Sequence, residues 1–412
     1  MSTDHQVVEG LPPTAEVVEL LDAAYDGWGD EELFEWKYDY PGTAADDHHL
    51  YVETDSTVTA FARLYHRTLF AGADRYDVVV RGNAAVHPDY RQMGQYTALH
   101  EATKRHCEST GADMVMTFNR KDNYSFETSA KNDWSHAELP LYLNILNPSA
   151  ALEEYARGVL EPNETLRRVA SLLGNRVRLS VAGDSVSLAS LVDDSVADTR
   201  GVTVHLSRDA LDELVELVAD GAGIRTLVGR GASLVARGEV SPFPVHETAP
   251  EAPSNDVDVI PRGAFVPSER AAIRRLYDTV FDGTTPEGRF RREAVDVEHM
   301  LSHPHHLGTL WLERDDDLAG FATVYTVRSG DVLEGRVADL VAVDGSARAT
   351  LVDALESVCR NNGLDVIAMF SPVVPDDRWV RIRRHVLMWN ELSSEAGGFS
   401  PPAWTLGFYD VV

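Results

Sequence analysis

Apolar and polar positions follow the same order twice along the chain. Three pairs of segments match, with small changes in the spacing between them. The pairs are LDAAYDG at 21–27 with YDTVFDG at 277–283, a hairpin pattern at 48–65 with another at 305–325, and 97–118 with 349–370, which align without gaps. Three matches in one order predict two copies of one α/β unit, which reads helix, strand, strand, strand, helix, strand.

The end of the unit carries the clearest periodicity. In the first copy, apolar residues recur at helical spacing from Ala98 to His106, and Gly111 ends the helix before the apolar strand MVMTF. With the strand DVVVRGNAAV before the helix, this order predicts a right-handed βαβ unit. We therefore predict the α/β (α+β) fold class, with two units built on mixed central sheets flanked by helices.

Between the copies, the sequence follows a different pattern. VRLSVAG, VTVHLS and GASLVARGEV have the composition of strands, and DALDELVELVADGAG that of an acidic amphipathic helix, an order that resembles sterol-carrier-type domains. HETAPEAPSNDVDVIPRG, rich in proline and acids, has the composition of a linker. We predict an amino-terminal domain at 1–149, a middle α+β domain at 150–245, a linker at 246–262 and a carboxy-terminal domain at 263–412.

Acidic residues outnumber basic ones throughout the chain. Asp and Glu number 66 against 37 Lys and Arg, which gives a formal net charge of −29. This balance, with scarce lysine, resembles the proteomes of salt-loving archaea, where exposed carboxylates hold water and cations. Such a surface repels nucleic-acid phosphates and anionic membranes, so we expect neither as a partner. The lysines are Lys37, Lys104, Lys121 and Lys131.

Cysteine usage and hydropathy indicate the compartment. Cys107 and Cys359 are too few for a disulfide scaffold, and both lie in helical patterns, which predicts reduced core thiols. No apolar run reaches transmembrane length, and the start MSTDHQVVEG lacks the basic and apolar segments of a secretion signal. We expect a cytoplasmic protein.

The turn HPDYRQMGQYTAL lies between the strand and the helix of the first βαβ unit. It contains no acid from Arg91 to Leu99. Backbone N–H groups at the amino end of a helix favour an anion, and Gly94 permits close approach or a positive φ. Arg91 adds a cation beside the turn. The turn is therefore a candidate site for a pyrophosphate.

The same residues resemble the acetyl-coenzyme A motif of the GCN5-related N-acetyltransferase (GNAT) superfamily. That motif is a strand ending V-x-P-x-x-R-x-x-G-x-G/A, followed by a helix and a strand, and Val86, Pro88, Arg91 and Gly94 stand at its spacing. Tyr96 departs from it, since the motif prefers a small residue there. The chain is distantly similar to enhanced-intracellular-survival type acetyltransferases, which join two such units to a sterol-carrier-type domain.

The resemblance implies roles for individual residues and acetyl-CoA as the co-substrate. The strand end would pair its backbone with the pantetheine arm of acetyl-CoA and hold the thioester, and the turn would wrap the pyrophosphate. Asn119 or Asn123 stands where the family often places a further coenzyme contact. The implied strand-end residues are Ala84, Ala85 and Val86, and those of the turn are Arg91, Gln92, Met93, Gly94, Gln95, Tyr96 and Thr97.

The second copy lacks this turn. Aligning LVAVDG on NAAVHP and restoring the helix register loses four residues, equivalent to 89–92, and leaves VDGSARATL without R-x-x-G. We therefore expect one active site, in the amino-terminal copy, and a degenerate carboxy-terminal unit that shapes the acceptor cleft.

The sequence pattern indicates the candidate acid and base residues less clearly than the coenzyme-binding residues. Many relatives protonate the leaving thiolate with a tyrosine, and the matching stretch TSAKNDW has Ser129 in that place. Tyr124 is a substitute, or it packs an aromatic edge. Glu53 is a candidate base acting through water, or a solvated acid, and His87 is a titratable neighbour of the strand end. By analogy with the aminoglycoside-acetylating relatives, the carboxyl group of Val412 is another candidate base.

Two further patterns leave alternatives open. The histidine pairs His48-His49 and His305-His306, the second with His303 nearby, lack a second ligand set at zinc-like spacing, so we predict no metal site. FEWKYDYPG at 34–42 either lines an acceptor pocket or packs the first helix on the sheet.

Acetyl transfer from a thioester to an amine needs no covalent enzyme intermediate, so the missing Ser-His-Asp pattern excludes nothing. The resemblance to the GNAT motif implies an N-acyltransferase, which we expect to move acetyl from acetyl-CoA to a primary amine of a small molecule by direct attack in a ternary complex. The alternative is a non-catalytic acyl-CoA-binding or regulatory protein. Aminoacyl transfer from charged tRNA is disfavoured by the surface charge. Assembly into a homo-oligomer is compatible with the sequence.

Overall fold

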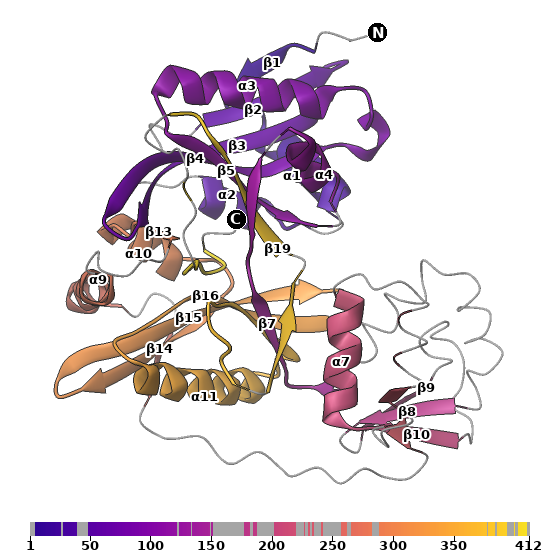
Figure 1. Cartoon of the computed structure of the whole chain (residues 1–412), viewed down its shortest axis with the longest axis vertical. Helices are drawn as coiled ribbons and strands as arrows, with labels where there is room; N and C mark the ends of the chain where they lie inside the picture. Colours follow the sequence, from indigo (N-terminus) through magenta and orange to yellow (C-terminus); the bar gives the residue numbers. More distant parts are fainter. Residues whose placement is uncertain are drawn as a thin grey trace.

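The computed structural model describes residues 5–25, 28–38, 48–121, 123–132, 134–148, 150, 177–181, 184–187, 202–219, 226, 230, 233–234, 240–241, 257–261, 265–281, 288–376, 378–383, 385–393, 399 and 403–409. Two large mixed sheets form the body of the molecule, one above the other in Figure 1, and a small sheet lies beside the lower one. The predicted α/β class, with two mixed sheets flanked by helices, is confirmed.

The first sheet has the strand order β1-β2-β3-β4-β5-β19-β6, and β13 also pairs with β3. Its strands are β1 (Val7–Glu9), β2 (His48–Thr54), β3 (Thr57–Ala71), β4 (Asp74–Val86), β5 (Met114–Arg120), β19 (His385–Glu391), β6 (Ser135–Glu138) and β13 (Gly288–Phe290). Its helices are α1 (Thr14–Tyr25), α2 (Glu31–Tyr38), α3 (Gln95–Thr110) and α4 (Tyr124–Lys131), with a 3₁₀ turn η1 at Pro88–Tyr90.

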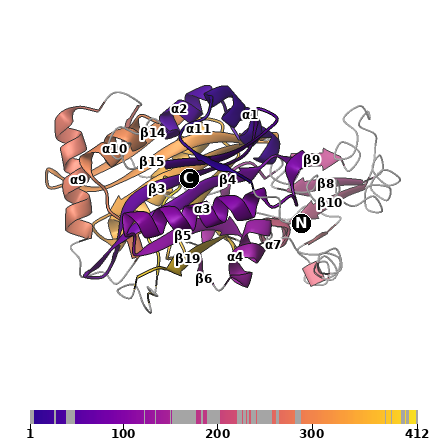
Figure 2. The same ribbon diagram turned by 90° about the horizontal axis from the view of Figure 1, so that it is seen from above.

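Helices cover both faces of the first sheet because its strands are apolar on both sides. Leu99 and Cys107 of α3 pack with Leu64 of β3 on one face. Leu20 of α1 packs with Phe61 of β3 on the other, where α2 also lies. In Figure 2, α3 runs along one side of the sheet while α1 and α2 lie on the opposite side.

The second sheet repeats this arrangement, with the order β12-β14-β15-β16-β17-β7-β18. Its strands are β12 (Asp258–Ile260), β14 (His306–Arg314), β15 (Asp317–Ser329), β16 (Val332–Ala342), β17 (Val366–Phe370), β7 (Leu141–Ile145) and β18 (Trp379–Ile382). Its helices are α9 (Pro267–Val280), α10 (Ala294–Leu301) and α11 (Gly345–Asn361). β12 lies at the end of the segment that the sequence assigns to the linker.

The repeat extends to the turns. The hairpin β2–β3 closes with Asp55 and Ser56 at φ 53° and 65°, and β14–β15 closes with Asp315 and Asp316 at φ 53° and 67°. Positive φ at both central residues of a two-residue loop is the type I′ geometry, which matches the twist of the strands. The acidic turns of the two sequence patterns are therefore the same structural device.

The two sheets exchange a strand. β19, from the carboxy-terminal part, inserts between β5 and β6 of the first sheet, and β7, from the amino-terminal part, inserts between β17 and β18 of the second. Figure 1 shows β19 in yellow beside the magenta strands and β7 in magenta beside the orange ones. The predicted domains 1–149 and 263–412 each contribute one central strand to the other's sheet, so neither sheet is complete without both segments.

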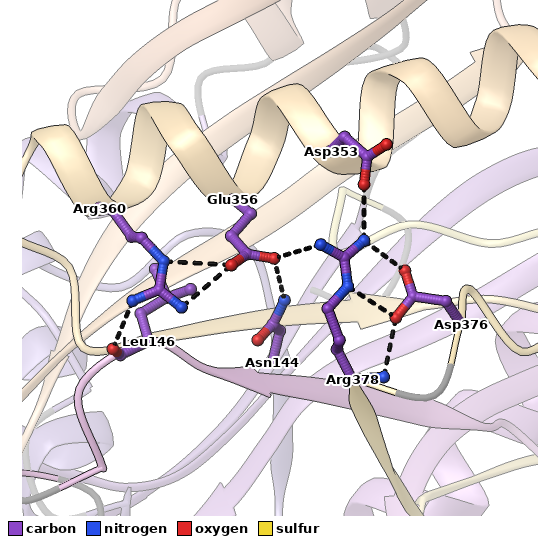
Figure 3. A network of polar contacts seen from close by, with 7 residues as sticks. All are labelled: Asn144, Leu146, Asp353, Glu356, Arg360, Asp376 and Arg378. Carbon is purple, nitrogen blue, oxygen red and sulfur yellow. Dashed lines mark hydrogen bonds and ion pairs between the residues drawn. The ribbon is translucent and has the colours of Figure 1, made fainter. Parts of the chain in front are cut away.

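A polar network fastens the exchanged strand β7 to the second unit (Figure 3). Glu356 of α11 accepts from Asn144 of β7 at 3.2 Å and forms ion pairs with Arg360 at 3.0 Å and Arg378 at 2.9 Å. Arg360 also donates to the carbonyl of Leu146 at 2.8 Å. The Glu356 carboxylate is almost fully buried, so these partners replace the water that it has lost.

We expect Glu356→Ala to lower the free energy of unfolding by about 2 kcal/mol, because Asn144 and two guanidinium groups lose a buried partner and only the arginines can regain water. Urea unfolding in concentrated salt measures the change. Glu101→Ala, which removes an exposed acid from α3, serves as the control and should change stability by less than about 0.5 kcal/mol. Equal stability of the two variants would contradict a structural role for the network.

Part of the predicted middle domain, 150–245, is described. β8 (Val177–Val181), β9 (Asp184–Ser187), β10 (Val202–Leu206) and β11 (Val240–Ser241) form a sheet of order β11-β10-β8-β9. Helix α7 (Arg208–Ala219) packs Leu211 and Val215 into the core that also holds Val380 of β18. Most of the segment that resembles a sterol-carrier-type domain lies outside the described residues, and the domain boundaries stay a prediction.

Candidate active site

The candidate site begins where β4 and β5 diverge. The two strands run parallel only over Val78–Arg81 and Met114–Thr117. β4 then continues to Val86 with β3 as its partner, so within the described part of the chain the edge of Ala84–Val86 that faces β5 has no partner strand. An extended ligand can pair with such an edge as a further strand would.

A bulge shapes this end of β4. The pairing with β3 shifts between Phe61–Ala85 and Arg63–Gly82, so that Asn83 and Ala84 together oppose Ala62. Asn83 has φ 47°, a left-handed conformation that asparagine adopts more readily than most residues. A bulge bends its strand and redirects the side chains next to it. Here it turns Asn83 toward α2, where its side chain contacts Lys37 and Tyr38.

The turn that follows presents a bare helix terminus. Gln92 at φ 65° and Gly94 at φ 91° reverse the chain into α3. Gly94 is the N-cap of α3 and offers no side-chain acceptor to the first N–H groups of the helix. Residues 91–94 are exposed, and no acid stands in the first turn of α3. Exposed, uncapped N–H groups and the helix dipole favour an anion at this point.

The corresponding helix of the second unit, α11, has a capped amino terminus. Asp344 caps α11, with its carboxylate accepting from the backbone N–H of Ala347 at 2.7 Å. Arg314 forms an ion pair with Asp344 at 3.1 Å and donates to Ser346 at 3.1 Å. A carboxylate already occupies the place that a phosphate would take, which supports the prediction that only the first unit holds a pyrophosphate.

The strand divergence of the second unit is also filled. β16 and β17 pair over Glu334–Arg336 and Val366–Ala368. Beyond this pairing, Phe408 and Tyr409 donate their backbone N–H groups to the carbonyls of Val337 and Ala338, each at 3.2 Å. The carboxy-terminal segment thus pairs with β16 directly beyond the residues that pair with β17.

The predicted turn residues adopt several orientations. The Gln95 side chain is buried and donates to Thr59 Oγ1 at 2.9 Å, so only its backbone faces the turn. Met93 is 51% exposed, and its carbonyl lies 2.7 Å from the ring nitrogen of His5. Arg91 is exposed beside the turn and reaches the carbonyl of Ala24 at 3.4 Å. Thr97, the third residue of α3, is also exposed.

Tyr96, where the sequence departs from the motif, packs beside the end of the β4–β5 pairing. Its hydroxyl accepts from the buried Arg81 at 2.8 Å, and its ring lies 6.2 Å from that of Tyr124. Arg81 also lies 3.1 Å from Nδ1 of His100. A large residue fits at this position because Arg81 binds its polar end.

The structure separates the predicted acid and base residues. Tyr124 is 70% exposed at the start of α4 and touches Tyr96. Glu53 is exposed on β2, with β3 between it and β4. Asn123 is exposed at the N-cap of α4, whereas Asn119 is buried and bonded to Ser125. Val412 lies outside the described residues.

Three polar residues near the site were missed in the sequence. Tyr25, at the end of α1, donates its hydroxyl to the carbonyl of Ala84 at 3.1 Å. Arg81 and Asn83 interrupt the apolar strand DVVVRGNAAV, and polar residues inside such a strand were a signal that could have marked them. Tyr25 had no comparable signal, because it closes an ordinary amphipathic helix.

The positions of the histidines and cysteines in the fold bear on their roles as possible metal ligands and thiols. Among the described residues, no group of three or more His, Cys, Asp or Glu is arranged to hold a metal ion, and the metal prediction stays a prediction. Cys107 and Cys359 are buried free thiols, as predicted, and burial raises the pKa of each to about 12. No helix in the described part of the chain is long and apolar enough to cross a membrane.

Histidines between the two units are held neutral. His299 stacks on Trp36 of α2 at 4.4 Å, and His303 stacks on Tyr325 at 3.7 Å. Burial lowers the pKa of His299 to about 4 and that of His303 to about 2. Trp36 also donates its indole N–H to the carbonyl of His299 at 2.9 Å, so this contact joins α2 to the second unit.

These lowered pKa values predict a loss of stability in acid. Between pH 6.5 and about 4, His299 and His303 bind protons in the unfolded chain but not in the folded chain. The free energy of unfolding therefore falls as the pH falls through this window. His303→Phe keeps a ring against Tyr325 and removes one titrating group. Urea unfolding at several pH values should therefore show a shallower slope for this variant. His136→Gln, at an exposed position, should keep the slope of the wild type; an unchanged slope in His303→Phe would contradict the assignment.

Comparisons with known proteins agree with this geometry. Residues 14–125, which include the turn and the open edge of β4, match the model of the acetyltransferase (GNAT) family. This match supports the resemblance of residues 14–125 to the GNAT family. The chain matches no curated protein sequence.

Three solved structures share the fold over most of the chain. A GCN5-related N-acetyltransferase from Anabaena variabilis aligns with a TM-score of 0.51 at 9% identity, over 94% of this chain and 73% of its own. N-myristoyltransferase from Saccharomyces cerevisiae, with bound myristoyl-CoA, aligns with a TM-score of 0.54 at 11% identity, over 98% and 85%. A probable N-acyltransferase from Enterococcus faecalis aligns with a TM-score of 0.51 at 9% identity, over 94% and 72%. At these identities the likeness concerns the fold.

Proposed function

We propose that the protein is an acyl-CoA-dependent N-acyltransferase with one site, at the open edge of β4 and the turn before α3. It transfers acetyl from acetyl-CoA to a primary amine of a small molecule. The family match and the acyltransferases among the structural neighbours support acyl transfer in general. The observation that carries the proposal is the contrast between the bare terminus of α3 and the capped terminus of α11.

The cofactor would lie along this open edge. Its pyrophosphate would meet the N–H groups of 94–97 and Arg91, and its amide-bearing arm would pair with Ala84–Val86. In this orientation the thioester carbonyl lies at the strand end, where backbone N–H groups stabilise the oxyanion. Asn123 at the N-cap of α4 would add a polar contact.

The reaction is a direct transfer. The neutral amine attacks the thioester carbonyl, a C–N bond forms, the C–S bond breaks, the amine loses a proton and the thiolate gains one. Tyr25 is a better placed acid than Tyr124, because its hydroxyl already lies 3.1 Å from the Ala84 carbonyl on the edge that the arm would follow. Of the two bases that the sequence suggested, Glu53 lies two strands away from β4 and Val412 lies outside the described residues.

Ser129 favours a second candidate function. It stands where many relatives carry the acidic tyrosine, and it is buried in α4. A chain that keeps the cofactor turn without this tyrosine could bind acyl-CoA without turning it over.

Thiol release separates the two functions. The protein is incubated in concentrated salt with acetyl-CoA and a panel of primary amines, and free thiol is measured with a chromogenic reagent. The proposal predicts release that depends on both enzyme and amine. Binding of acetyl-CoA without amine-dependent release would establish the non-catalytic alternative.

A further inference from the structure

Lys37 extends from α2 to the bulge of β4. Its ammonium nitrogen lies 3.3 Å from Oδ1 of Asn83 and 5.1 Å from the ring of Trp28. Within the described part of the chain, no carboxylate lies at ion-pair distance from this amine. Asn83 directly precedes Ala84–Val86, the segment that would hold the thioester. Lys37 therefore places a titratable nitrogen next to the proposed reacting centre.

The amine approaches β4 from the face opposite α3. Arg81 points toward α3, where it binds Tyr96, whereas Asn83 points toward α2. A cofactor bound at the terminus of α3 leaves the α2 face for the second substrate. Lys37 is thus placed on the side from which an amine can reach the carbonyl.

The second unit fixes this position. Trp36, the residue before Lys37, stacks on His299 and donates to its carbonyl, and the Tyr409 hydroxyl lies 3.2 Å from Nδ1 of His299. The Lys37 carbonyl accepts from the buried Arg63 at 2.8 Å. α2 is therefore held through the side chain of Trp36 and through the backbone carbonyl of Lys37. These contacts fix the position of the Lys37 amine, and proton transfer in catalysis requires a fixed position.

The surroundings favour the neutral amine. Burial, then the positive charges of Arg63 on β3 and Arg336 on β16, lower the pKa of Lys37 to about 7. Tyr38 on the same helix and the neutral His303 also face this region, and Glu334 pairs with Arg336 at 3.1 Å. In a chain in which all but four of 37 basic residues are arginine, lysine stands where arginine would stay charged.

We propose that Lys37 is the base that removes the proton from the acceptor amine during acyl transfer. This inference rests on the proposed function. As the C–N bond forms and the C–S bond breaks, the proton leaves the attacking nitrogen for Nζ of Lys37, and the thiolate takes its proton from a hydroxyl group. Asn83 holds the lysine nitrogen through Oδ1 and so positions it beside the strand end.

The test is the pH profile of kcat/KM, measured by thiol release with an amine that supports turnover. The wild type should lose activity below a pH of about 7, where Lys37 is protonated. Lys37→Met and Lys37→Arg should each lower kcat about 100-fold and lose this acidic limb, since neither side chain accepts a proton at neutral pH. Lys104→Met, at an exposed lysine of α3, should retain the rate and profile of the wild type.

A further variant separates a chemical role from a structural one. Arg336→Gln removes a positive charge near Lys37 and leaves Glu334 behind, so it should move the acidic limb toward higher pH while the chain stays folded by circular dichroism. A structural lysine would not produce this shift.

Each other outcome has a distinct meaning. Wild-type activity in Lys37→Arg with an unchanged acidic limb would overturn the role of Lys37 and leave the proposed function intact. An acetyl group found on Lys37 by mass spectrometry would make it a nucleophile and also overturn the inference. No amine-dependent thiol release by the wild type would refute the proposed function and the inference with it.

Discussion

Gly94→Glu should abolish the binding of acetyl-CoA. The glutamate would place a carboxylate at the uncapped start of α3, where the pyrophosphate is proposed to bind, and two negative charges at one helix terminus repel. The left-handed φ of 91° adds strain of about 1–2 kcal/mol for any side chain. The fold should survive, because a Cβ at Gly94 meets only His5, at 3.9 Å. Titration calorimetry in concentrated salt should show affinity lowered more than 100-fold.

Two variants accompany this measurement. Gly94→Ala introduces the backbone strain without the charge and should weaken binding less than Gly94→Glu does. Ser346→Glu adds the same charge to the corresponding turn of the second unit, where Asp344 already caps the helix. It should leave the affinity unchanged. Tight binding by Gly94→Glu would show that the pyrophosphate lies elsewhere.

Gly407→Ala should destabilise the protein more than any surface substitution. A Cβ at Gly407 would lie 1.8 Å from the carbonyl oxygen of Ala338, a distance that no side chain can occupy. The carboxy-terminal segment must then leave the edge of β16, and the hydrogen bonds of Phe408 and Tyr409 are lost with it. We expect a decrease of about 3 kcal/mol in the free energy of unfolding, measured with urea in concentrated salt.

Gly345→Ala is the matched control. It is also a glycine-to-alanine change in the second unit, but nothing lies within 4 Å of a Cβ there and its φ is not positive. Alanine suits the first turn of a helix, so stability should stay equal or rise by a few tenths of a kcal/mol. If Gly407→Ala were as stable as Gly345→Ala, the segment 407–409 would not be held in the divergence of β16 and β17.

The sequence predicted the elements better than their partners. The repeat and the crossover helices were readable because helical spacing and Gly111 are local signals. The exchange of β7 and β19 was not, because an apolar strand such as LYLNI buries equally well in either sheet. Strand alternation shows which faces are buried and carries no information about which neighbour supplies the hydrogen bonds.

For the candidate site, too, only the part that is local in the sequence was predictable. The anion-binding turn was visible because glycine, arginine and the missing acids are adjacent in the chain. The groups that meet there in space were not, since Tyr25, Lys37 and Asn83 come from α1, α2 and a bulge whose contacts depend on tertiary packing. Gln95 shows the opposite error, because the motif cannot tell a side chain that faces the ligand from one that binds Thr59 inside the sheet.

The stoichiometry of acetyl-CoA binding tests the central claim most directly. Titration calorimetry of the protein in concentrated salt should give one molecule of acetyl-CoA per chain. The first unit has an open strand edge and an uncapped helix terminus, whereas in the second unit Asp344 caps the helix and residues 408–409 pair with β16. Absence of binding, or two molecules per chain, would contradict the account.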